Sequence, residues 1–284
     1  MIICTTTNEM RAACCAARQG GKRLGLVPTM GALHEGHLSL VRAARASCDV
    51  VAVSIFVNPT QFGPKEDLAK YPRSFERDRE QLEREGVDLL FAPAVEEMYR
   101  AGSATWVTVT HLSGKLDGRS RPGHFRGVTT VVAKLFHIVE PDVAFFGQKD
   151  AAQAAIIRRM VRDLNLPVEI VVCPIVREPD GLALSSRNAY LDAEQRKQAL
   201  VLYRALVRVK QLAESGERSA VRLAAAGRQE IAAEPSVRLD YFEIVDPETL
   251  DPVEDISRGA LVAVAAFVGT TRLIDNVVLE KIAG

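Results

Sequence analysis

Short apolar runs alternate with amphipathic segments through the first 176 residues of the chain. The runs are rich in β-branched and aromatic residues, and several are apolar on both faces, as strands of a helix-covered parallel sheet are. They are residues 23–29, 49–57, 87–93, 105–112, 141–147 and 168–176. Segments 37–47, 74–86, 127–139 and 150–165 have the apolar spacing of helices. The alternation predicts an α/β fold with a Rossmann-like parallel sheet.

Beyond about Val176 the pattern changes. Two long charged segments, 192–215 and 218–233, have helical spacing, and two apolar segments, 237–246 and 260–280, are typical of a meander. We therefore predict a Rossmann-like domain over residues 1–176 and a smaller α+β domain over residues 177–284. Open doubly wound sheets bind ligands beyond the carboxyl ends of their strands, so chemical motifs are expected just after strands.

Composition favours a small-molecule partner over nucleic acid or a membrane. The 36 basic and 36 acidic residues cancel, and 1 tryptophan and 5 tyrosines offer no obvious base-stacking platform. No window reaches the apolar length of a membrane span, and residues 1–23 lack a secretion signal. The 5 cysteines have no metal-type spacing, which favours reduced packing residues in a cytoplasmic protein.

The segment LVPTMGALHEGHLSLV, residues 26–41, places His34 and His37 three positions apart at a strand-to-helix turn. A zinc protease helix has H-E-x-x-H spacing instead, and no third ligand stands out, so a metal site is a poor interpretation. The start of a helix attracts anions, and Gly31 and Gly36 would let a phosphate approach the backbone. The alternative is structural, with one capping and one packed histidine.

Two further turns follow predicted strands. GQKD contains Lys149, which can reach phosphate oxygens, and Asp150, which can cap the next helix. LSSRN, residues 184–188, gathers two hydroxyls and a guanidinium after Gly181. Each motif alone is more often a surface lysine, a plain cap or turn serines. Three such turns at strand ends together favour one phosphate-binding function.

The chain resembles the pantothenate synthetase (pantoate–β-alanine ligase) family. The resemblance runs through VPTMGALHEGHLSLV, VSIFVNPTQFGPKEDLAKYPRSFERD, KLDGRSRPGHFRGVTTVVAKLF, PDVAFFGQKDAAQ and LALSSRNAYL, while the C-terminal third matches by length and pattern. H-x-G-H alone would indicate only the broader nucleotidyltransferase superfamily. The resemblance implies ATP-dependent condensation of (R)-pantoate with β-alanine through an enzyme-bound pantoyl adenylate, giving the coenzyme A precursor pantothenate, AMP and pyrophosphate.

The resemblance also implies roles for individual residues. It implies catalytic roles for His34, His37, Lys149, Ser185, Ser186 and Arg187. It implies ATP contacts from Met30, Gly31, Ala32, Leu33, His34, Glu35, Gly36, His37, Gly147, Gln148, Lys149, Asp150, Val176, Leu184, Ser185, Ser186 and Arg187. It implies pantoate binding by Gln61 and Gln153, and a Mg²⁺ contact from Asp78, whose alternative is an ordinary surface pair with Arg77.

These residue types suit the chemistry. When a carboxylate attacks the α-phosphorus, the site must neutralise oxygens that gain charge as pyrophosphate departs. Lys149, Arg187, hydroxyls, Mg²⁺ and histidines can do so, whereas Gln61 and Gln153 can hold a hydroxylated acid without quenching its carboxylate. The amine then displaces AMP, so no serine or cysteine nucleophile is required, and G-x-S-x-G is absent.

Alternatives remain open. An adenylyltransferase of the same superfamily would leave AMP on its substrate, and an inactive nucleotide-binding scaffold would keep the fold alone. A kinase would need the G-x-x-x-x-G-K-[ST] spacing, which is absent. We expect a homodimer, with 105–112 as an exposed strand. Loops 63–73 and 114–127 are rich in glycine, proline and charge, the composition of loops that cover sites, and we expect at least one of them to be poorly ordered or displaced without ligand. The alternative is that they are solvated connections.

Overall fold

The structure is a computed structural model that describes residues 1–64, 66 and 68–281. Its contacts group the chain into two compact units. Unit 1 comprises Met1–Ser113, Arg121–Gly147 and Ile156–Pro174, and unit 2 comprises Gly114–Ser120, Gln148–Ala155 and Ile175–Gly284. Unit 2 is therefore assembled from three separate stretches of sequence, and the domain boundary after residue 176 stays a prediction.

The core of unit 1 is a parallel sheet with strand order β1-β4-β3-β2-β5-β6. Its strands are β1 Ile2–Cys4, β2 Leu24–Thr29, β3 Val50–Ile55, β4 Leu89–Phe91, β5 Val143–Gly147 and β6 Glu169–Cys173. The apolar runs of β2 to β5 are buried almost throughout, as strands covered on both faces must be. This confirms the predicted α/β class.

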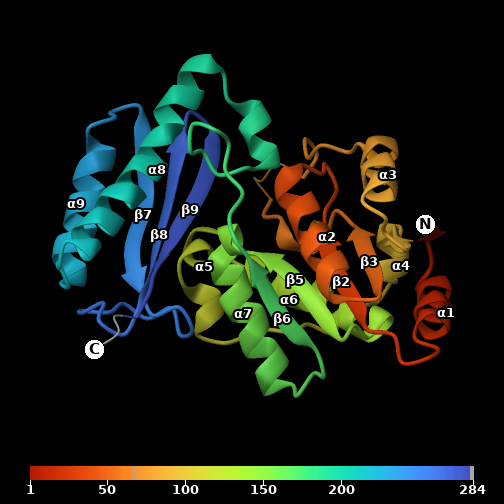
Figure 1. Cartoon of the computed structure of the whole chain (residues 1–284). Coiled ribbons are helices and arrows are strands. Elements are labelled where there is room, and N and C mark those ends of the chain that lie inside the picture. Colours follow the sequence, from red (N-terminus) through yellow and green to blue (C-terminus); the bar gives the residue numbers. More distant parts are fainter. Residues whose placement is uncertain (65, 67, 282–284) are drawn as a thin grey trace. The chain divides into compact units, whose positions relative to one another are not determined.

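Helices α1 Thr7–Ala17, α2 Glu35–Ser47 and α6 His124–Val139 contact strands of this sheet (Figure 1). The other helices are α3 Phe75–Arg84, whose Leu82 joins the buried cluster of the sheet, α4 Val95–Met98 and α7 Ala151–Asp163, of which α7 begins in unit 2. The apolar face of α2, with Leu40, Val41 and Ala44, joins Val27 and Val53 of the strands in one buried cluster. Helix α6 is buried along most of its length, in keeping with its run of valines.

The strand predicted over residues 105–112 is wrong. Residues 103–109 form no helix or strand, and η2 Leu112–Gly114 follows. The backbone N–H of Val107 donates to Thr130 Oγ1 at 3.0 Å, and Thr129 Oγ1 donates to the Val107 carbonyl at 2.7 Å. Because hydroxyls of α6 satisfy this backbone, no neighbouring strand is needed, and the alternating pattern instead reflects burial of Val109 and Leu112.

Unit 2 contains the predicted α+β fold. Strands β7 Val237–Val245, β8 Ala260–Val268 and β9 Thr271–Leu279 form an antiparallel sheet in the order β7-β8-β9. Helices α8 Ala193–Glu214 and α9 Ala220–Ala232 cover one face of this sheet, and Asp192 and Ser219 cap their first turns (Figure 1). Short helical segments α5 Asp117–Ser120, η3 Gln148–Asp150 and η4 Ser186–Tyr190 complete the unit.

The cysteines are free thiols. Cys4, Cys14, Cys48 and Cys173 are buried, which confirms their packing role, whereas Cys15 is exposed on the solvent side of α1 and does not pack. Burial raises the pKa of the Cys14 thiol to about 12, and it also raises the pKa of the other three buried thiols. These protonated thiols are poor nucleophiles.

Within the described part of the chain, no helix combines the length and the apolar character that a membrane crossing requires.

Candidate functional site

The parallel sheet of unit 1 has its topological switch point between β2 and β5. From β2 the chain continues to β3 on one side, and after β4 it returns to place β5 on the other side. The predicted histidine turn directly follows β2, and the Gly147–Asp150 turn directly follows β5. Both turns therefore start at the carboxyl ends of β2 and β5, which is the place where open α/β sheets bind ligands.

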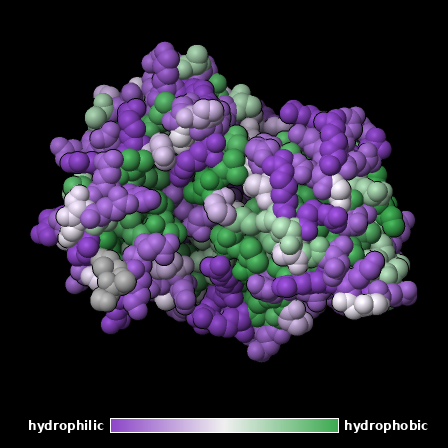
Figure 2. Space-filling view, in the orientation of Figure 1, coloured by the Kyte–Doolittle hydropathy of each residue, from purple (hydrophilic) through white to green (hydrophobic). Residues whose placement is uncertain are grey.

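Asp78 holds the turn after β2 in shape. Its Oδ2 accepts the backbone N–H of Ala32 at 2.8 Å, and its Oδ1 accepts that of Leu33 at 2.9 Å and the Ser74 hydroxyl at 3.1 Å. The outer surface of α3 is hydrophilic (Figure 2), yet Asp78 points inward and is 1% exposed. The surface-pair alternative for Asp78 is therefore wrong, and its metal role stays a prediction.

Unusual backbone angles show why this turn needs support. Gly31 has φ +82°, and Ala32 has φ +52°, a left-handed conformation that a side chain disfavours. A Cβ on Gly31 would lie 3.1 Å from Asp78 Oδ2 and from Ile55 Cγ2. Glycine is therefore required for the close approach of the turn to Asp78, and the carboxylate compensates for the strain at Ala32.

His34 and His37 form a reciprocal cap at the start of α2. His34 Nδ1 accepts the backbone N–H of Gly36 at 3.2 Å, and His37 Nδ1 accepts that of His34 at 3.3 Å. The two rings are 4.1 Å apart between centroids, and both residues are half-buried. Because each Nδ1 accepts, a neutral ring carries its hydrogen on Nε2. Capping and Nε2–H donation are thus compatible roles of the same histidines.

Gln61, at the end of η1 Pro59–Gln61, belongs to a buried amide network. Its Nε2 donates to Met30 Sδ at 3.0 Å, and its Oε1 accepts from Asn58 Nδ2 at 3.1 Å. Asn58 Nδ2 also donates to the Gly127 carbonyl at 3.1 Å. The structure therefore joins two predicted site residues, Met30 and Gln61, through contacts of one side chain. Sequence reasoning missed Asn58, although it stands in the quoted NPTQ motif.

Three charged or titratable side chains surround the backbone of Gln61. Its carbonyl accepts from His124 Nδ1 at 2.8 Å, and His124 Nε2 lies 3.0 Å from Arg121 Nη1. Arg121 in turn makes a paired contact with Glu66, at 2.8 and 2.6 Å. Burial raises the pKa of the Glu66 carboxyl, but hydrogen bonds and charge from Arg121 outweigh burial, and the pKa is lowered overall. Sequence reasoning placed Arg121 and His124 only in a covering loop.

In unit 2, the turn after β5 is held by Asn276 of β9. Asn276 Nδ2 donates to the carbonyls of Gln148 and Lys149 at 2.9 and 3.0 Å, and its Oδ1 accepts from Gln148 Nε2 at 2.9 Å. Lys149 Nζ lies 3.8 Å from Asp150 Oδ1, and its side chain is 21% exposed. The lysine is thus partly enclosed rather than an ordinary surface residue. Gln153 follows in the first turn of α7 and is half-buried.

The remaining predicted ATP contacts of unit 2 lie beside one another. Leu184 donates its N–H to the Val176 carbonyl at 3.0 Å, and Arg177 pairs with Ala183 as an antiparallel bridge. The chain therefore doubles back between Val176 and the LSSRN turn. At that turn Ser185 Oγ accepts the N–H of Arg187 at 3.3 Å and caps η4.

No group of three or more histidine, cysteine, aspartate or glutamate side chains is placed to hold a metal ion, among the residues that the structure describes.

The fold and these turns define a doubly wound α/β protein of the nucleotide-binding class. A family model described as pantoate-beta-alanine ligase matches residues 2–278. A pantothenate synthetase from Koribacter versatilis is 65% identical over 280 residues, 99% of this chain and 96% of the relative. One from Thermotoga neapolitana is 60% identical over 279 residues, 98% of this chain and all of the relative. The chain belongs to the pantoate-beta-alanine ligase family, as its motifs predicted.

Solved structures of pantothenate synthetases support the same family assignment. The crystal structure of pantothenate synthetase from Thermus thermophilus is 52% identical, with a TM-score of 0.93 over 98% of this chain and 99% of that chain. The ligase from Francisella tularensis, complexed with beta-gamma ATP and beta-alanine, is 33% identical, with a TM-score of 0.81 over 98% of this chain and 97% of that chain. The likeness spans both units.

Proposed function

We propose that this chain joins pantoate to β-alanine in two steps at the expense of ATP. In the first step a pantoate carboxylate oxygen bonds to the α-phosphorus, and the bond from that phosphorus to pyrophosphate breaks. In the second, the amine of β-alanine bonds to the pantoyl carbon, AMP leaves with the shared oxygen, and the amine loses a proton. The observation that carries the proposal is the family match across residues 2–278, together with the two phosphate-type turns at the switch point.

We assign the charge that develops on the phosphates to groups of both turns. The Nε2–H groups of His34 and His37 are suited to donate to phosphate oxygens, because both Nδ1 atoms are occupied by backbone N–H groups. Lys149 supplies a positive charge, and Arg187 with Ser185 and Ser186 supplies further donors. Val176 and Leu184, joined by a backbone hydrogen bond, provide an apolar edge for adenine.

Gln61 is our candidate for pantoate recognition in unit 1. Its amide is buried among Met30 and Asn58, so its orientation is fixed before substrate binds. A neutral amide can hydrogen-bond a hydroxyl or carboxylate without withdrawing the charge that the nucleophile needs. Gln153 is proposed as the second pantoate amide by family resemblance.

Mg²⁺ fits this chain as a partner of the ATP phosphates. Asp78 is the predicted protein contact, but its oxygens already accept two backbone N–H groups and the Ser74 hydroxyl. We therefore propose that the ATP phosphates and water supply the ligands of Mg²⁺, and that Asp78 acts on it only through the turn that it shapes. When bound, the cation would neutralise phosphate charge.

We also propose that the enzyme works in the cytoplasm as a homodimer. Free, largely buried thiols are compatible with a reducing compartment. Residues 105–112, first expected to be an exposed strand, form no strand. Sedimentation at micromolar concentration tests the oligomeric state, and a monomer there would contradict it.

Isotope exchange tests the reaction directly. With pantoate and Mg²⁺ but no β-alanine, labelled pyrophosphate should exchange into ATP, because adenylate formation is reversible without the amine. Pantoate with heavy carboxylate oxygen should transfer one label to AMP on addition of β-alanine. ADP as a product, or unlabelled AMP, would refute the adenylate. AMP kept on the product would indicate an adenylyltransferase, and absence of any ATP turnover would indicate a scaffold.

A further inference from the structure

Asn276 lies on β9, far along the sequence from every motif that indicated the reaction, yet it contacts the lysine turn directly. It is 3% exposed, and both halves of its amide are occupied by η3. The amide nitrogen donates to two consecutive carbonyls, those of Gln148 and Lys149. A side chain that spans two successive carbonyls fixes the direction in which the turn presents its residues.

Asn276 is itself rigidly held. Its backbone N–H donates to Asp275 Oδ1 at 2.7 Å, and its carbonyl accepts from Arg177 Nη2 at 3.4 Å. Arg177 also binds the Asp275 carboxylate through both terminal nitrogens, at 2.6 and 2.9 Å. The Asp275 side chain is 4% exposed, so this bidentate pair is shielded from solvent and geometrically specific.

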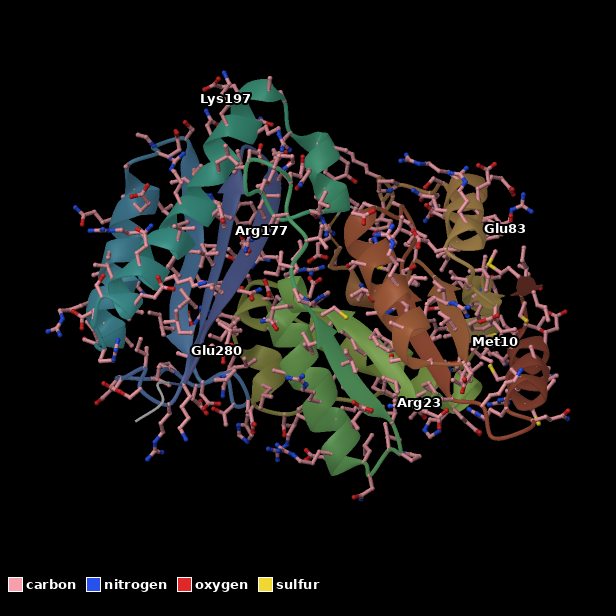
Figure 3. The ribbon with its side chains drawn as sticks, viewed as in Figure 1. Met10, Arg23, Glu83, Arg177, Lys197 and Glu280 are labelled. Atoms are coloured by element: carbon pink, nitrogen blue, oxygen red, sulfur yellow. The ribbon has the colours of Figure 1, made fainter. Side chains whose placement is uncertain are left out.

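Arg177 links this anchor to a second predicted ATP segment. It directly follows Val176, donates to the Gly181 carbonyl at 3.0 Å, and lies over the ring of Tyr203 at 4.5 Å. Figure 3 shows Arg177 beside β9. Gly181 has φ +97°, and a Cβ there would lie 2.2 Å from the Tyr203 ring, so the loop after Arg177 has little freedom. A continuous hydrogen-bonded path thus runs from the Val176 segment through Asp275 and Asn276 to Lys149.

We propose that Asn276 is a positioning residue for catalysis: it fixes the Gln148–Lys149 turn so that the lysine meets the ATP phosphates. The inference rests on the proposed function, because Lys149 matters only if ATP binds there. Asn276 touches no reacting atom and acts through the two carbonyls. Without it, the turn would keep its sequence and charge but lose its fixed direction, so the lysine would spend less time in the productive geometry.

The test compares Asn276→Ala and the isosteric Asn276→Asp with wild type. Asn276→Ala removes the amide, whereas Asn276→Asp keeps its size but faces two carbonyls with acceptors only. For both we expect kcat/KM for ATP to fall about 10- to 30-fold, because both variants lose the two hydrogen bonds to the carbonyls of Gln148 and Lys149. Asn276→Ala also loses the bond from Gln148 Nε2, which Asn276→Asp can keep. The KM for β-alanine should be unchanged. If Asn276→Asp fails to fold, Asn276→Ala carries the comparison.

A matched control lies on the same strand. Arg272 is another polar anchor of β9, with a half-buried side chain bonded to Asp117 at 2.7 Å and to Asp240 at 2.8 Å. Arg272→Lys should lower the melting temperature without changing kcat/KM for ATP, because no residue of the two ATP segments bonds to it in these contacts. If Arg272→Lys and Asn276→Ala reduce kcat/KM equally, the effect is general loss of stability and the proposal is overturned.

A double-mutant cycle with Lys149→Ala supplies the decisive readout. If Asn276 acts through Lys149, adding Asn276→Ala to Lys149→Ala should lower kcat/KM for ATP by less than twofold. Additive losses would overturn the positioning role. Wild-type activity is measured first: an inactive wild type contradicts the proposed function, whereas an active wild type with additive variants contradicts only this inference.

Discussion

Replacing Asp78 with asparagine separates support of the phosphate turn from metal binding. The two side chains have the same size, so Asp78→Asn opens no cavity. The carboxylate accepts backbone N–H groups of both Ala32 and Leu33, at 2.8 and 2.9 Å, whereas an amide has one oxygen and can accept only one of them. The other N–H would face an NH₂ group at a site that is 1% exposed.

The cost follows from that loss. A hydrogen bond to a charged group contributes about 1.5–3 kcal/mol, and a buried N–H left unpaired costs about 1–3 kcal/mol. These effects overlap, so we expect Asp78→Asn to reduce the free energy of unfolding by about 3 kcal/mol. For a domain of this size the melting temperature should fall by roughly 6–12 °C. Because the turn carries the histidines, KM for ATP should rise about tenfold.

Thermal unfolding and a Mg²⁺ titration of initial rates measure both quantities. The Mg²⁺ concentration at half-maximal rate, at saturating ATP, should be unchanged. Ser74→Ala is the matched control, because it removes only the neutral hydroxyl bond to Asp78 and should cost about 1 kcal/mol or less. A variant with wild-type stability and a strongly raised Mg²⁺ requirement would refute our reasoning and show that Asp78 binds the metal.

Three further predictions use other contacts. His37→Ala should lower kcat about 10²–10³-fold by removing a phosphate donor, and normal turnover with only a lower melting temperature would contradict that role. Gly127→Ala places a Cβ 2.4 Å from the Thr60 carbonyl oxygen. To relieve this clash the backbone next to Gln61 must shift by about 1 Å, so kcat/KM for pantoate should fall about 100-fold. Gly227→Ala in unit 2 is the control: its Cβ would lie 2.2 Å from the Phe242 ring, and the variant should lower stability without lowering kcat/KM for pantoate. The lowered pKa of Glu66 stabilises the fold above its ordinary value of about 4.5, and this stability is lost as pH falls through the folded-state pKa. Glu66→Gln should therefore lower the melting temperature at pH 7, and by progressively less as the pH falls below about 4.5. A loss that does not shrink with falling pH would exclude the ion pair with Arg121 as its cause.

The local pattern of apolar residues was sufficient to predict most strands of the parallel sheet. Strands β2 to β5 were predictable from apolar runs between turns, because strands covered on both faces must be apolar at successive positions. The edge strand β6 is only partly buried, but its apolar run was also found. β1 was missed because it is only three residues long and its two isoleucines are exposed. The segment 105–112 was mistaken for a strand because alternation cannot reveal that threonines of α6 satisfy its backbone.

The site was predictable where it is local and obscure where it is assembled over distance. H-x-G-H, GQKD and LSSRN are contiguous, so residue type and spacing pointed to them. Asn58 and Asn276 are ordinary amides until partners distant in sequence, such as Gly127 and Lys149, are brought to them. A hydrogen bond between distant residues leaves no periodic trace in one sequence. The predicted covering loop 114–127 contains Lys115, Asp117 and Arg119, which form ion pairs with residues of unit 2. In the other predicted loop, 63–73, residues 65 and 67 lie outside the described residues.

The three-part composition of unit 2 has a consequence for biosynthesis on the ribosome. Arg272 and Asn276 are translated near the end of the chain, whereas their partners Asp117 and Gln148 are 155 and 128 residues earlier. Closing such long loops is entropically costly and slow compared with forming α8 or α9. During translation, the segments that contain Asp117 and Gln148 therefore cannot form their bonds with Arg272 and Asn276 until β9 has left the ribosome. A chain truncated before β9 would lack the asparagine that holds the Gln148–Lys149 turn, so this turn reaches its final form only after the last strand has been translated.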